Sequence, residues 1–83
     1  MSVLTSAERR LLLEAAFAGV NHGLLRQVRA IVPVVPSLVT DSDACAVCMA
    51  VLLLGLNAPE EAKRVLQHVN TPDADVVKHC FSL

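Results

Sequence analysis

The sequence lacks the side chains on which several functions depend. Tryptophan and tyrosine are absent, and the only aromatic residues are Phe17 and Phe81. Seven lysines and arginines stand against eight aspartates and glutamates, which gives a net charge of −1. Proteins that bind nucleic acids need an excess of positive charge for the phosphates, and often aromatic rings that stack on bases. We therefore expect no nucleic-acid partner.

Cysteines are few and odd in number: Cys45, Cys48 and Cys80, all in apolar surroundings. Small secreted domains use an even set paired in disulfides, so this pattern favours a reducing compartment, the cytoplasm. Cys45 and Cys48 match a CxxC motif. A redox pair of this kind follows a strand at a helix start, and a zinc site needs two more ligands. We expect core packing, with no metal and no cofactor; a thiol or metal protein built on the three cysteines is an alternative.

Long apolar runs are also missing. The longest apolar block covers 13 residues, 44–56, whereas a helix needs about 18–20 to span a bilayer. At the N-terminus, Glu8, Arg9 and Arg10 precede a short apolar run, which differs from a signal peptide. We expect no membrane insertion. The alternative is a small membrane-active protein whose helix at 44–56 pairs with lipid.

What the sequence does contain is an excess of apolar residues. They make up 54% of 83 residues, and the mean hydropathy is +0.56. A chain of this length forms one domain, residues 1–83, with proportionally more surface than a large protein. It should be less apolar than average, and it is more so. The surplus must therefore face a partner or a membrane.

Capping and breaking signals divide the chain into helices. Thr5 and Glu8 have the spacing of a capping box, Gly19 and Gly55 follow apolar helical stretches, and Asn57 precedes Pro59 as a helix cap. Two prolines predict an extended connector over 33–39. The chain is predicted to be all-α, with helices over 6–18, 23–32, 43–54, 59–69 and 73–81.

A short repeat joins two of these helix pairs. Gly19-Val20-Asn21 recurs as Gly55-Leu56-Asn57, offset by 36 positions. Each copy links a helix that is apolar almost all round to a helix that is apolar on one side. This order and period are typical of tetratricopeptide repeats. We predict two tetratricopeptide-like helical hairpins plus a short C-terminal helix, with the first helix of each hairpin lining a concave groove.

The hairpin register predicts which side chains line this groove and contact a partner's amphipathic helix. Phe17 fits either the groove, as an anchor, or the core, and the aliphatic residues could instead be buried in the chain's own core. The polar group of Arg9, Arg10 and Glu14 is a solvated face or a polar rim for a partner. His22 has no nucleophile or carboxylate marked beside it, so we predict no catalytic residue. The predicted partner-binding residues are Leu13, Ala16, Phe17, Val20, Val47, Val51 and Leu54.

The segments FAGVNHGLLRQV (17–28) and LLLGLNAPEEAKRVL (52–66) resemble the tetratricopeptide-like chaperones of type III secretion needle subunits, of the YscG, PscG and EscG type and most closely the short SsaH-like branch. The resemblance covers about 15–81. It implies a bacterial cytoplasmic, non-enzymatic protein that joins a small helical co-chaperone at its first helix. In a heterodimer or heterotrimer, it binds the needle subunit's C-terminal amphipathic helix and prevents premature polymerisation. A generic helical adaptor with an obligate partner is the alternative.

Overall fold

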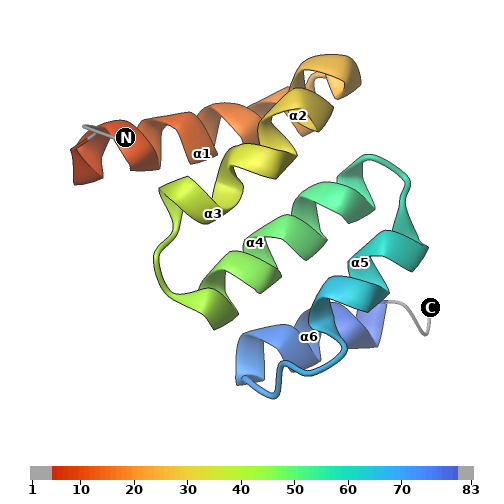
Figure 1. Ribbon diagram of the computed structural model, residues 1–83. Coiled ribbons are helices and arrows are strands. Elements are labelled where there is room, and N and C mark those ends of the chain that lie inside the picture. The colour runs from red at the N-terminus through yellow and green to blue at the C-terminus, as the bar shows by residue number, and fades with distance from the viewer. Residues whose placement is uncertain (1–4, 81–83) are drawn as a thin grey trace.

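The computed structural model describes residues 5–80 and, at position 80, the backbone alone (Figure 1). Over these residues the chain is helical and contains no strand, which confirms the all-α prediction. The predicted end of the last helix, Phe81, lies outside the described residues. The helices are α1 (Ser6–Asn21), α2 (Leu25–Ile31), the 3₁₀ turn η1 (Val32–Val34), α3 (Val35–Leu38), α4 (Ser42–Gly55), α5 (Pro59–Leu66) and α6 (Pro72–Cys80).

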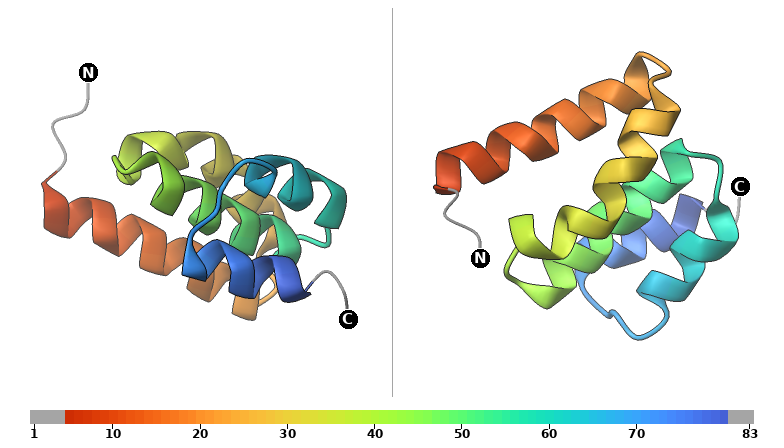
Figure 2. Two further views of the ribbon diagram at one scale, coloured as in Figure 1. Left: turned by 90° about the horizontal axis from the view of Figure 1, so that it is seen from below. Right: turned by 45° about the horizontal axis from the view of Figure 1, so that its top comes forward.

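The helices form two hairpins and a closing helix. α1 pairs with the bent segment α2–η1–α3, α4 pairs with α5, and α6 packs against both α4 and α5. α1, α4 and α6 run in the same general direction (Figure 1). Seen from below, α3 and α5 lie on one side of α4, and α1 and α6 lie on the other (Figure 2, left). α4 is therefore the central helix of the fold.

Three helices begin at side-chain caps, and the first of them is the predicted capping box. The Thr5 hydroxyl accepts a hydrogen bond from the backbone N–H of Glu8 (3.1 Å), and the Glu8 carboxylate accepts one from the backbone N–H of Thr5 (2.8 Å). The bond from the Thr5 backbone lowers the pKa of Glu8, so this cap weakens only when the pH falls through that lowered value. Asp41 accepts from Ala44 N–H, and Thr71 accepts from Ala74 N–H.

Both hairpin turns have the same backbone structure. Leu24 N–H donates to Gly19 C=O and Gly23 N–H to Val20 C=O, and the second turn repeats this pair of bonds from Ala58 and Asn57. These are Schellman motifs, which need a left-handed residue after the helix. Gly23 (φ 74°) and Asn57 (φ 60°) supply it. Asn57 thus ends α4, and the prediction that it caps the next helix was wrong, because its own backbone is already used in the turn.

The turns also correct the period of the repeat. α2 begins at Leu25 and α5 at Pro59, 34 residues later, which is the length of a tetratricopeptide repeat. The offset of 36 between the two Gly-x-Asn sequences is not the structural register. Nor does Gly19 end the first helix, since α1 continues to Asn21 with Gly19 buried inside it. A Cβ on Gly19 would lie 2.7 Å from Val28 Cγ2, so glycine is there to let α2 approach.

The predicted extended connector at 33–39 is helical instead. Val32 and Val35, each directly before a proline, have φ, ψ of −50°, −47° and −52°, −40°. Each proline sits in the first turn of a new short helix, where its missing N–H is not needed. Val32, Val35 and Leu38 are buried. Burial of these side chains outweighs the local preference of a pre-proline residue for extended backbone.

The core is apolar, with no buried polar or charged residue among those described. Residues 34 positions apart are buried together: Ala16 with Ala50, Val28 with Ala62, and Val32 with Leu66. Arg29 of α2 and Glu61 of α5 join the hairpins at the surface through two hydrogen bonds of 3.3 and 3.4 Å. Lys78 Nζ donates to Val69 C=O at 2.6 Å and so ties α6 to the segment that follows α5.

We predict that Gly19→Ala destabilises the protein although alanine favours helices. The new methyl group would press on Val28, a stiff and fully buried side chain, and overpacking of this kind costs about 1–3 kcal/mol against a helix-propensity gain of about 1. Urea unfolding would measure the difference. Val28→Ala removes the clashing methyl group, so the double variant should lose less than the sum of the single losses. Simple additivity would contradict the close approach.

Candidate partner-binding face

One stripe of the candidate site lies on α1. Leu13, Phe17 and Val20 follow each other at intervals of four and three residues, so they share one side of the helix. All three are half-buried and pack against the core with the remainder of their surface accessible. The sequence left open whether Phe17 lies in the groove or in the core. In the structure it belongs partly to each, because its side chain packs on the core and stays partly accessible.

The second stripe lies on α4. Val47, Val51 and Leu54 have the same spacing of four and three residues. Ala50, Leu52 and Leu53 point into the core, whereas Val51 between them remains 37% exposed. Val47 and Leu54 are half-buried at its sides. Because α4 has no charged residue after Asp43, this accessible strip is apolar along its length.

The two stripes are equivalent positions of neighbouring hairpins. Leu13 and Val47, Phe17 and Val51, and Val20 and Leu54 are each 34 residues apart, the interval at which the fold repeats. They meet at the C-terminal ends of the helices, where Gly55 lies against the Val20 side chain and has no room for a Cβ. We call this surface the apolar face. Its members are Leu13, Phe17, Val20, Val47, Val51 and Leu54.

Ala16 does not belong to this surface, although the sequence placed it in the groove. It is fully buried, as is its equivalent Ala50. The reason is its position on α1: it lies one turn before Gly19, on the side where α2 comes closest. A partner has no access to it in this fold.

α1 also exposes apolar side chains that sequence reasoning did not single out. Leu11 is 66% exposed and Leu12 is 40% exposed. Leu11, Ala15 and Ala18 share one side of the helix, and all three are exposed. We call these three residues the outer stripe. The sequence does indicate this exposure. The helix is apolar almost all round, and one neighbouring hairpin cannot bury two opposite apolar sides of the same helix.

The two described thiols are shielded from water. Cys45 is buried and Cys48 half-buried, and both are free. Burial raises the pKa of each thiol, and the nearby Cys45 raises that of Cys48 further. A raised pKa leaves less thiolate, which is the nucleophile and the metal ligand. This environment is that of packed cysteines; the Cys80 side chain lies outside the described residues.

The described histidines and acidic residues do not form a catalytic or metal-binding cluster. His22 is the exposed C-cap residue of α1, and His68 is exposed after α5. Among the described side chains, which end at position 79, no three His, Cys, Asp or Glu residues are grouped so that they could hold a metal ion. In the same part of the chain, no helix has both the length and the apolar character needed to cross a bilayer.

Comparison with known proteins identifies a family. The family model described as "protein of unknown function (DUF1039)" matches residues 17–81, and the chain belongs to this family. The match begins at Phe17 and so includes only the C-terminal end of α1, together with both hairpin turns and α6. No curated protein and no solved structure matches the chain.

We predict that Cys45 and Cys48 react slowly with iodoacetamide. In a Cys80→Ser variant at about pH 8, alkylation should be at least about tenfold slower than that of N-acetylcysteine, because burial raises both thiol pKa values. Mass spectrometry over time would give the rates. Unfolding in urea is the control and should restore ordinary reactivity. A thiol that reacts in the folded protein as fast as the free compound would contradict the packing described above.

Proposed function

We propose that this protein is a cytoplasmic chaperone subunit of a bacterial type III secretion system. Together with a small helical co-chaperone, it binds the amphipathic helix of the needle subunit and prevents premature polymerisation. The mechanism is sequestration: each apolar surface covers the other until secretion. It involves no catalytic step and no cofactor.

The observation that carries this proposal is the apolar face. It is accessible, uncharged and built from equivalent positions of two hairpins, with Val51 exposed at its centre. An amphipathic helix presents apolar side chains at intervals of three and four residues. The apolar face has these same intervals on two neighbouring helices. A helix lying on it would bury the accessible parts of both stripes, which water otherwise contacts.

The outer stripe supports the second part of the proposal. α6 packs on α4 and α5 at the C-terminal end of the hairpin stack, whereas at the other end Leu11, Ala15 and Ala18 remain exposed on α1. End units of helical repeats normally present a polar outer face. A small helical co-chaperone bound along α1 would cover this stripe, and the needle helix could occupy the apolar face at the same time, because the two surfaces lie on different sides of α1.

Co-expression is the first test. The tagged chain, the needle subunit and the co-chaperone produced together should give a soluble, stoichiometric complex burying more than the roughly 1,600 Å² of a standard interface. The chain produced alone should aggregate or self-associate. Pull-down measures whether the complex forms, and light scattering measures its stoichiometry and the self-association of the chain produced alone. A lone chain that is monomeric, well folded and indifferent to both candidate partners would contradict the proposed function.

A pair of matched variants tests the apolar face. Val51→Asp should abolish needle-subunit binding, because the partner helix would bury an unpaired charge. Val34→Asp, on η1, introduces the same charge at a valine that is 46% exposed, against 37% for Val51, and should bind normally. Both positions already contact water, so both variants should fold, as circular dichroism would show. Normal co-purification of Val51→Asp would mean that the partner binds elsewhere.

A further inference from the structure

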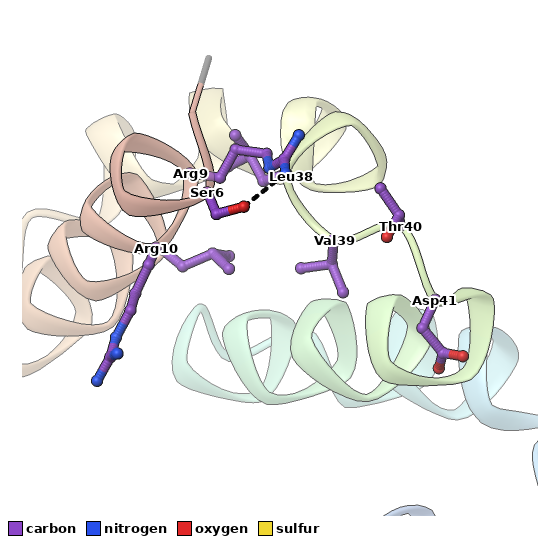
Figure 3. A pocket seen from close by; sticks show the side chains of 8 residues that line it. Ser6, Arg9, Arg10, Leu38, Val39, Thr40 and Asp41 are labelled. Atoms are coloured by element: carbon purple, nitrogen blue, oxygen red, sulfur yellow. Dashed lines mark hydrogen bonds between the residues drawn. The ribbon is translucent and has the colours of Figure 1, made fainter.

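An open pocket lies where α1 begins, beside the turn that leads from α3 into α4. Its volume is about 340 Å³. Val39 and Leu13 supply apolar lining, and Leu13 also belongs to the apolar face. A helix that covers the apolar face therefore reaches this pocket at its end. Arg9 and Arg10 of α1 line the pocket on one side, and residues 38–41 line it on the other (Figure 3).

The two arginines of the pocket are placed differently. The Arg10 side chain extends away from Arg9 (Figure 3) and pairs with Glu14 at 3.3 Å on the open surface. Arg9 is half-buried and reaches from α1 toward Leu38 (Figure 3). Its Nη2 donates to Ser6 Oγ at 3.2 Å, and no carboxylate among residues 5–80 forms an ion pair with it. Most of its five N–H donors are thus still available.

The charge at the pocket favours a negative group. Asp41 is the one carboxylate in the lining, and it accepts the Ala44 N–H at 2.8 Å at the N-terminus of α4. The positive end of that helix offsets the Asp41 charge. The Arg9 guanidinium has no such compensation. Its planar fork matches a carboxylate, and its half-buried position makes such a pair stronger than one in open water.

We propose that Arg9 pairs with a side-chain carboxylate of the partner helix, while an apolar side chain beside that carboxylate fills the pocket between Leu13 and Val39. This inference rests on the proposed function and deepens it. The apolar face alone would accept a helix in either direction, because its two stripes carry no charge. A carboxylate held at the N-terminal end of α1 fixes the direction and register of the bound helix.

The test uses the chain purified together with the co-chaperone. It is titrated with a fluorescent synthetic peptide of the needle subunit's C-terminal helix, amidated at its C-terminus. Arg9→Gln should weaken binding about three- to tenfold at about 50 mM salt, and the difference should largely vanish at about 500 mM. Arg26→Gln, an exposed change on α2 outside the pocket, should stay within about twofold of the wild type.

Charge exchange identifies the partner group. Arg9→Glu should weaken binding further, and replacing one acidic residue of the peptide by lysine should restore it. If no single acidic-to-lysine replacement in the peptide restores binding to Arg9→Glu, the pairing is overturned. Equal losses for Arg9→Gln and Arg26→Gln would overturn it as well. If the free-acid peptide alone responds to Arg9→Gln, the chain terminus binds there and the side-chain assignment is wrong.

The outcome separates this inference from the proposed function. If the wild type binds the peptide, Val51→Asp does not, and Arg9→Gln binds like the wild type, then only the role of Arg9 is overturned. If the wild type binds no peptide, or Val51→Asp binds normally, the proposed function is overturned and the pairing with it.

Discussion

Removal of α4 from water is the constraint on which the rest of the structure depends. After Asp43 this helix has no charged side chain, so it offers water almost nothing but apolar surface. It packs against α1, η1, α3, α5 and α6. Leu52 and Leu53 are essentially inaccessible, and full burial of each such side chain stabilises the fold by roughly 1.5–3 kcal/mol. The 83-residue chain has too few helices to cover α4 on every side, and the side that bears Val51 stays accessible to water.

Close approach of the helices makes this burial possible. Gly19 lets α2 pack directly on α1, and Gly55 lets the end of α4 pack against Val20 of the preceding hairpin. One glycine acts within a hairpin and the other between hairpins. The two Schellman turns then place both hairpins in the same register, so that side chains 34 positions apart have the same surroundings. The two stripes of the apolar face lie side by side because of this register.

The elements best predicted from sequence were those fixed by neighbouring residues. The capping box of Thr5 and Glu8 depends on side chains and backbone groups three positions apart. The errors arose where distant residues decide. Val32 and Val35 are helical before prolines because their side chains are buried in the segment η1–α3 that packs on α4. Ala16 is in the core because Gly19 brings α2 close. Asn57 was assigned to the wrong side of its turn, since a left-handed C-terminal residue and an N-cap look alike in sequence. The exposed fractions of the Phe17 and Val51 side chains could not be predicted from the sequence, because they depend on how neighbouring helices pack.

The apolar surplus of the composition is divided between separate surfaces. Part of it is on the apolar face and part on the outer stripe, while the core itself is closed by α6 at only one end of the stack. Two separate surfaces suit two different occupants better than one large patch would. On the proposed function, the co-chaperone completes the stack at α1 and the needle helix takes the place of the missing cover over α4. Both events then involve α1, which bears both surfaces: a co-chaperone bound along α1 would lie on the same helix as Leu13 and Arg9, the residues at which the needle helix would be aligned.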